Sequence, residues 1–103
     1  MAYKLIISDR AIEQIDSIVG YVKNTLSSPG AAASILSDIN EAFDKLEYMA
    51  ESFGYCNDRY LMLKGYRKML LARHNYVIIY CVVGQEVRIS GVFHMKEDYA
   101  KKL

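Results

Sequence analysis

Apolar residues in the first half of the chain recur with the spacing of amphipathic helices. Residues 3–8 (YKLIIS) first form a short aliphatic run that predicts a strand buried on both faces. Ser8 and Asp9 then supply a helix N-cap and a first-turn acid. The apolar positions that follow, three or four residues apart, are Ile12, Ile15, Ile18 or Val19, Val22 and Leu26. This spacing predicts a helix with one apolar face.

A second helix is predicted directly after the first. The segment SSPG interrupts the pattern, with Ser28 as a cap for the next helix and Pro29 in its first turn. A second apolar stripe then runs through Ala32, Ile35, Ile39, Ala42 or Phe43, Leu46 and Met49. Two helices joined by so short a link form a hairpin, and their apolar stripes need a sheet to cover.

The second half of the chain has the pattern of strands and tight turns. Residues 50–58 lose the helical period and predict a loop. Four predicted strands follow: RYLML (59–63), YRKMLLAR (66–73), YVIIYCVV (76–83) and EVRISGVFH (86–94). Gly84 suits the positive φ of a two-residue turn. We expect YVIIYCVV to be a central strand, and RYLML to be an edge strand open to pairing with another chain.

The last predicted strand alternates between two faces. Val87, Ile89, Gly91 and Phe93 are expected on one face, whereas Arg88 and His94 are expected on the other, less apolar face, with Ser90 and Val92. The tail MKEDYAKKL predicts a short helical turn or a mobile end. Together the elements predict one α+β domain over residues 1–103, of order β-α-α-β-β-β with one further strand. Its helix hairpin packs on one face of a mostly antiparallel, twisted sheet.

Composition places the chain among globular proteins. It has 103 residues, of which 52% are hydrophobic and 24% charged. No apolar run reaches the roughly 20 residues of a membrane span, and the first residues lack the core of a signal peptide. We therefore expect a cytoplasmic protein without a membrane partner. Cys56 and Cys81 fit no metal spacing and are expected to be reduced packing residues, so no metal or cofactor is predicted.

Charge is divided unequally along the chain. Residues 1–58 carry four Lys or Arg against nine Asp or Glu, a net charge of −5, whereas residues 59–103 carry nine against three, a net charge of +6. Such a cationic half indicates a polyanionic target or an acidic protein partner. The alternative is that the two halves neutralise each other within the domain.

The order of elements and several motifs resemble a known superfamily. With GYRKMLLARHNYVIIYCV, the following VRISGVFH and the closing HMKEDY, the chain resembles the RelE/ParE superfamily of toxins from type II toxin–antitoxin modules over nearly its whole length. The resemblance implies a toxin that inhibits growth and is neutralised by a cognate antitoxin protein in a heteromeric complex. A small departure is Ala50, where many relatives have a proline.

The resemblance implies one of two activities. RelE-like toxins cut mRNA on the ribosome without a metal, and such chemistry needs a proton acceptor, a proton donor and positive charge near the phosphate. ParE-like toxins inhibit DNA gyrase, which requires a binding surface and no catalytic residue. Many RelE-like ribonucleases carry an arginine where this chain has Val77, and their alternating lysines are incomplete here because Leu70 follows Lys68. The target, ribosome or gyrase, therefore stays open.

Several residues are candidates for a site. Arg67 and Arg73 share a strand parity and have fork-shaped donors for phosphate, while His94 is the candidate acid or base and Tyr99 could stack on a nucleobase. The candidates for nucleic-acid binding are Lys64, Lys68, Arg88 and Lys96. Structural roles compete with these: a fold-supporting ion pair for Arg67, a solvated charge for Arg73, a backbone hydrogen bond for His94 and packing for Tyr99. The alternative function is a non-toxic, degenerate module that binds nucleic acid or protein.

Overall fold

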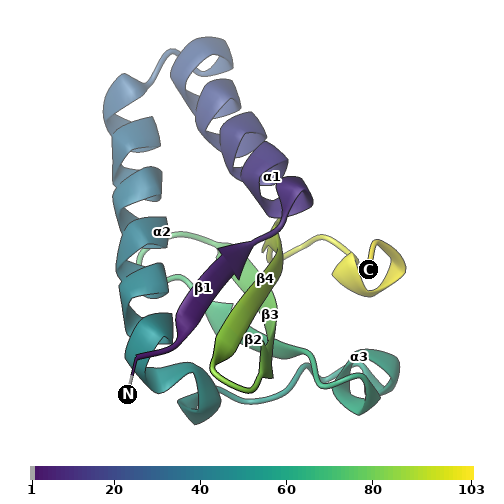
Figure 1. The fold of residues 1–103 in the computed structure, drawn as a ribbon. Coiled ribbons are helices and arrows are strands. Elements are labelled where there is room, and N and C mark those ends of the chain that lie inside the picture. The colour runs from purple at the N-terminus through teal and green to yellow at the C-terminus, as the bar shows by residue number, and fades with distance from the viewer. Residues whose placement is uncertain (1) are drawn as a thin grey trace.

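A four-stranded sheet and a pair of long helices make the two main layers of the structure, a computed structural model that describes residues 2–103 (Figure 1). The strands are β1 (Lys4–Ile7), β2 (Arg67–Leu70), β3 (Tyr76–Val83) and β4 (Glu86–His94). They lie in the order β1-β4-β3-β2, with β1 parallel to β4 and the other two pairs antiparallel. The predicted class, a helix hairpin on one face of a mostly antiparallel sheet, is confirmed.

The hairpin begins where the sequence predicts it. Helix α1 (Asp9–Gly20) continues as a π-helix, η1 (Tyr21–Thr25), and α2 (Pro29–Met49) follows, ending in the 3-10 turn η2 (Ala50–Ser52). The hydroxyl of Ser8 accepts a hydrogen bond from the backbone N–H of Ala11 at 3.1 Å, so the predicted N-cap is confirmed. Ser28 occupies the N-cap position of α2, but its side chain makes no capping bond.

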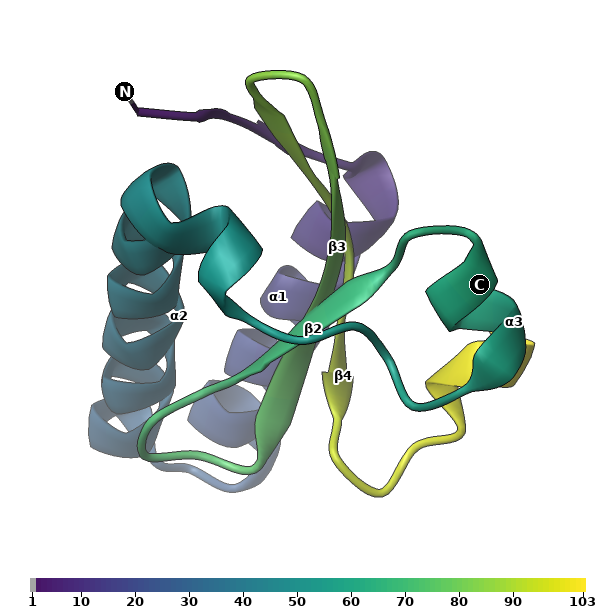
Figure 2. The ribbon, with the colours of Figure 1, turned by 90° about the horizontal axis from the view of Figure 1, so that it is seen from below.

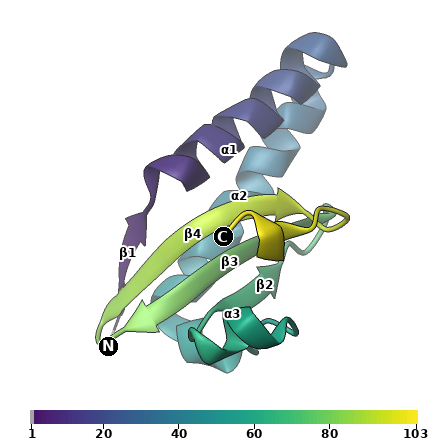
Figure 3. The ribbon, with the colours of Figure 1, turned by 90° about the vertical axis from the view of Figure 1, so that its right-hand side faces the viewer.

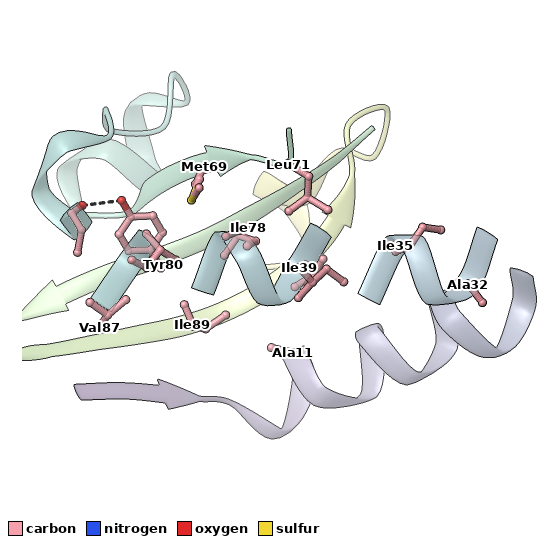
Figure 4. Close-up of a cluster of buried hydrophobic side chains, with 14 of the residues drawn as sticks. Ala11, Ala32, Ile35, Ile39, Met69, Leu71, Ile78, Tyr80, Val87 and Ile89 are labelled. Carbon is pink, nitrogen blue, oxygen red and sulfur yellow. Dashed lines mark hydrogen bonds between the residues drawn. The ribbon is translucent and has the colours of Figure 1, made fainter. Parts of the chain in front are cut away.

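The main core lies between the hairpin and the sheet (Figure 4). Buried helix residues include Ala11, Ala32, Ile35, Ile39, Ala42 and Leu46, and buried strand residues include Ile78, Tyr80, Val87, Ile89 and Val92. The hydroxyl of the fully buried Tyr80 donates to the carbonyl oxygen of Ala50 at 2.6 Å, which joins the centre of the sheet to the end of the hairpin. Three residues of the predicted stripes are instead exposed: Ile12, Leu26 and Met49.

Strand β1 differs from its prediction in burial. Leu5 and Ile7 pack against the main core, but Lys4 and Ile6 are exposed. The reason is that β1 is an edge strand, and only the face of the sheet that carries the hairpin is covered at this position. A continuous aliphatic run was therefore an insufficient signal of burial on both faces.

The predicted strand RYLML is wrong, because residues 59–63 form the short helix α3 (Arg59–Leu63). The Asp58 carboxylate accepts a hydrogen bond from the backbone N–H of Leu61 at 3.0 Å, and Gly65 follows the helix with φ of 85°. An acidic N-cap before the segment and a left-handed glycine after it favour a helical turn over a strand. The edge strands are instead β1 and β2.

Strand β2 is shorter than predicted and ends at Leu70. Beyond it the backbone N–H of Arg73 donates to the Asp38 carboxylate at 3.0 Å, so the chain turns toward α2. Strands β3 and β4 are confirmed, as is the tight turn between them, where Gly84 has φ of 61°. The predicted C-terminal helical turn is present as η3 (Tyr99–Lys101).

A β-bulge in β4 overturns the predicted alternation. Ile79 pairs with Gly91 but Tyr80 pairs with Ile89, so Ser90 is an extra residue in β4. Val87, Ile89 and Val92 consequently join the main core, whereas Phe93 faces the other side of the sheet. Arg88 pairs with Cys81 and His94 with Tyr76, two β3 residues of opposite parity. Arg88 and His94 therefore lie on opposite faces, contrary to the prediction.

Smaller elements cover part of the second face of the sheet. Figure 2 shows α3 and the C-terminal segment together on the side opposite α1 and α2, and Figure 3 looks onto this side of the strands. They cover a second cluster of buried side chains: Cys56, Leu61, Val77, Ile79 and Phe93. Within residues 2–103, no helix has the length and apolar character that crossing a membrane requires.

Candidate functional site

A small cleft opens on the second face of the sheet, between β2 and the C-terminal segment. It has a volume of about 150 Å³ and is lined by Lys68, Leu70, Val77, Met95 and Tyr99. Leu70 and Met95 are about half exposed, at 50% and 47%, whereas Val77 is buried at 2%. The cleft thus combines one flexible cation with an apolar lining, and Lys68 and Tyr99 are the two predicted site residues that it brings together.

Val77 lies where the resemblance places an arginine in many ribonucleases. Its side chain is part of the second buried cluster and lines the cleft without adding charge. Leu70, which interrupts the expected alternation of lysines, lies opposite Val77 in the neighbouring strand. This part of the cleft therefore offers an apolar surface where phosphate chemistry would need cations.

Arg67 lies outside the cleft and holds the segment that follows α2. Its guanidinium donates hydrogen bonds to the carbonyl oxygens of Phe53 at 2.6 Å and Glu51 at 3.3 Å, and to the hydroxyl of Tyr55 at 2.9 Å. It also stacks over the Tyr55 ring at 4.1 Å from the centroid. These contacts engage most of the donors of Arg67 within the protein.

Arg73 and the neighbouring His74 contact α2 through a buried carboxylate. Asp38 is 1% exposed and accepts hydrogen bonds from the Arg73 backbone N–H at 3.0 Å and from His74 Nδ1 at 2.9 Å. The Arg73 side chain pairs with Glu41 at 2.6 Å. These contacts join charged residues of the acidic first half of the chain to charged residues of the cationic second half. Sequence reasoning missed Asp38, because its partners lie more than thirty residues away.

The Asp38 carboxyl is held ionised despite its burial. Burial alone would raise its pKa, but the hydrogen bonds from His74 and the Arg73 backbone, with the charge of Arg73, lower the pKa below its ordinary value of 3.8. A carboxyl whose pKa is depressed in the folded state stabilises the protein above its unfolded pKa, and this contribution is lost as the pH falls through the folded pKa.

We expect Asp38→Asn to destabilise the protein at neutral pH, and its difference from the wild type to shrink as the pH falls below about 4. Urea unfolding midpoints over a pH series measure this difference. Asp44→Asn is the matched control, because Asp44 lies on the same helix and is exposed. A difference between wild type and Asp38→Asn that stays constant from neutral pH to pH 3 would contradict the assignment.

His94 shapes the turn that begins the C-terminal segment. Its Nδ1 accepts a hydrogen bond from the Lys96 backbone N–H at 3.1 Å, and its own backbone N–H donates to Glu97 at 3.0 Å. The ring meets Tyr76 edge-on, with the centroids 5.4 Å apart. The Glu97 carboxylate also accepts a hydrogen bond from the Lys102 ammonium group. The bond from Lys102 and, to a smaller extent, the bond from the His94 backbone lower the pKa of the Glu97 carboxyl.

The other predicted cations are spread over the surface. Lys64 lies over the Tyr60 ring at the end of α3, Arg88 pairs with Glu86 at 2.9 Å, and Lys96 is exposed in the C-terminal turn. Among residues 2–103, no group of three or more His, Cys, Asp or Glu side chains is arranged to hold a metal ion. The structure thus brings Lys68 and Tyr99 together but places Arg67, Arg73 and Arg88 apart from them.

A family model covers almost the whole of this fold. The model described as "ParE toxin of type II toxin-antitoxin system, parDE" matches residues 5–99. The chain belongs to the ParE toxin family. This membership confirms the predicted superfamily and accounts for the arrangement of a helix hairpin on a four-stranded sheet.

Two solved structures share the fold of this ParE family member. The chromosomal ParDE toxin–antitoxin system from P. aeruginosa is similar with a TM-score of 0.76 and 21% identity, over 92% of this chain and 98% of that chain. The toxin–antitoxin complex RelBE2 from Mycobacterium tuberculosis is similar with a TM-score of 0.59 and 16% identity, over 91% of this chain and 99% of that chain. No curated protein sequence gives a significant match.

Proposed function

We propose that this ParE-family toxin inhibits growth by binding DNA gyrase. The observation that carries the proposal is the separation of the candidate catalytic side chains. Arg67 is held by residues 51–55 and Arg73 pairs with α2, while His94 lies on the opposite face of the sheet from Arg88, a candidate for binding the nucleic acid. A ribonuclease needs a base, an acid and cations around one phosphate, whereas inhibition by binding needs only a surface.

The cleft on the second face is the proposed contact surface for this target. Its exposed Leu70 and Met95 supply apolar area, and Lys68 adds one positive charge. A small apolar centre with a charged rim is the usual composition of a protein–protein contact. The catalytic roles predicted for Arg67, Arg73, His94 and Tyr99 belong to the competing ribonuclease function.

A cognate antitoxin is the second proposed partner. Both solved relatives are described as toxin–antitoxin assemblies, which supports a heteromeric complex for this chain as well. An extended antitoxin segment that covers the cleft would block the contact with gyrase. Co-purification of the toxin with the product of a neighbouring small gene tests this pairing.

We expect labelled thymidine incorporation to fall before labelled methionine incorporation when the toxin is induced in bacteria without its antitoxin. Purified gyrase should lose supercoiling activity in the presence of the toxin. Lys68→Ala is expected to weaken both effects, while Lys45→Ala, an exposed lysine on α2, leaves them unchanged. An earlier fall of methionine incorporation would favour ribosome-dependent cleavage of mRNA, and no fall of either would favour the degenerate binding module.

A further inference from the structure

Three side chains outside the cleft form a relay from a buried carboxylate to an exposed hydroxyl. Asp38 and Ser34 lie one turn apart on α2, and His74 projects from the turn between β2 and β3 to lie against both. His74 Nδ1 is 2.9 Å from Asp38 Oδ2, and His74 Nε2 is 3.5 Å from Ser34 Oγ. The order carboxylate, imidazole, hydroxyl is that of a base-assisted nucleophile.

The hydrogen bonds determine which nitrogen of His74 carries the proton. An ionised carboxylate only accepts hydrogen bonds, so Nδ1 of His74 is the donor to Asp38. In the neutral imidazole Nε2 then has a free lone pair, which faces the hydroxyl of Ser34. Asp38 is held in place by the backbone N–H of Arg73, and the Arg73 side chain bonds to Glu41 and also forms an ion pair with Asp38 at 3.8 Å. The fold therefore presents a proton acceptor beside Ser34.

We propose that Ser34 is a nucleophile that takes an acyl group from an activated ester, with His74 as its general base and Asp38 as a positioning residue. With an aryl ester as the donor, Ser34 Oγ forms a bond to the carbonyl carbon, the bond from that carbon to the aryl oxygen breaks, and the phenolate leaves with the electron pair. The hydroxyl proton passes to His74 Nε2 and from there to solvent.

The exposure of Ser34 limits the kind of donor that this site can use. Ser34 lies on the outer surface of α2, so water surrounds the oxygen on which negative charge develops. The protein stabilises a solvated oxyanion only slightly, and the acyl donor must therefore carry a good leaving group. This inference concerns a different surface from the cleft and holds whether the toxin acts on gyrase or on the ribosome.

The chain contains a matched control for this reactivity. Ser37 lies on the same helix and is exposed like Ser34, but no imidazole lies within hydrogen-bond distance of its hydroxyl among the residues that the structure describes. The difference in acylation rate between the two serines therefore measures the contribution of His74. General-base assistance contributes about 10²-fold or more in rate.

The test is acylation of the purified full-length chain by p-nitrophenyl acetate, with the acetyl group located by peptide mass spectrometry. We expect Ser34 to be acetylated about 10²-fold faster than Ser37. His74→Gln should lower the rate at Ser34 to that of Ser37, because glutamine can donate to Asp38 but cannot accept the proton. Asp38→Asn should also lower the acetylation rate at Ser34, while the rate at Ser37 stays unchanged.

Two outcomes would overturn the proposal. Equal acetylation of Ser34 and Ser37 in the wild-type chain would show that His74 gives no assistance. A rate at Ser34 that is unaffected by His74→Gln, in a variant whose urea unfolding midpoint matches the wild type, would reduce the cluster to a structural contact. If His74→Gln unfolds instead, the comparison of Ser34 with Ser37 in the wild type still decides the question.

Discussion

Replacing Phe93 by alanine is expected to destabilise the protein by about 3–5 kcal/mol. Phe93 is fully buried on the second face of the sheet, where it packs in the cluster beneath α3 and the C-terminal segment, and its ring centroid lies 5.8 Å from that of Tyr99. Truncation leaves a cavity that so small a cluster cannot refill. Urea unfolding midpoints of wild type and variant measure the loss.

The control for this substitution is Tyr48→Ala, because Tyr48 is 69% exposed on α2. It should change the free energy of unfolding by no more than about 0.5 kcal/mol. Amide exchange should also accelerate more in α3 and η3 than in α1 and α2, since the cavity opens beneath the former pair. A loss below about 1 kcal/mol would mean that the second cluster adds little to stability.

Gly91→Ala is expected to destabilise the protein by about 1–3 kcal/mol through overpacking. A Cβ at this position would lie 2.5 Å and 2.8 Å from two atoms of the Phe93 ring and 2.9 Å from Gln14 Oε1. Neither neighbour can move freely. Phe93 is fully buried, and Gln14 Oε1 accepts a hydrogen bond from the Val92 backbone N–H at 2.9 Å.

Gly20→Ala should have the opposite effect. A Cβ there meets nothing within 4 Å, and the residue has a helical φ of −63°. Alanine reduces the freedom of the unfolded chain, so we expect stabilisation by about 0.4–1 kcal/mol. Thermal unfolding of both variants measures the contrast. Equal midpoints for Gly91→Ala and the wild type would show that the bulge relaxes to admit a side chain.

Local signals were enough to predict much of the fold. The cap at Ser8, the proline that opens α2 and the left-handed turn at Gly84 act through neighbouring residues, and each is present as predicted. The strand prediction for RYLML failed because a five-residue segment is too short to distinguish the two apolar periods. Asp58 before it and Gly65 after it carried the deciding signal.

The site was harder to predict because it depends on register. Arg88 and His94 are six residues apart, a spacing that places both side chains on one face of a regular strand. The extra residue Ser90 shifts the register of β4 and places them on opposite faces. Gly91 inside the strand was the available signal of a bulge. Asp38 gave no such signal, because the apolar stripe around it is complete without it and its partners are in a distant turn.

The pairing of β1 with β4 joins residues 4–7 to residues 86–89, so β1 has no partner strand until β4 has been made. A chain growing on the ribosome can assemble its helix hairpin early, but β1 must wait for β4. Synthesis that stops before β4 therefore leaves a product without the parallel pair and with an incomplete sheet. Whatever this toxin binds through that sheet, it can bind only after β4 has been translated.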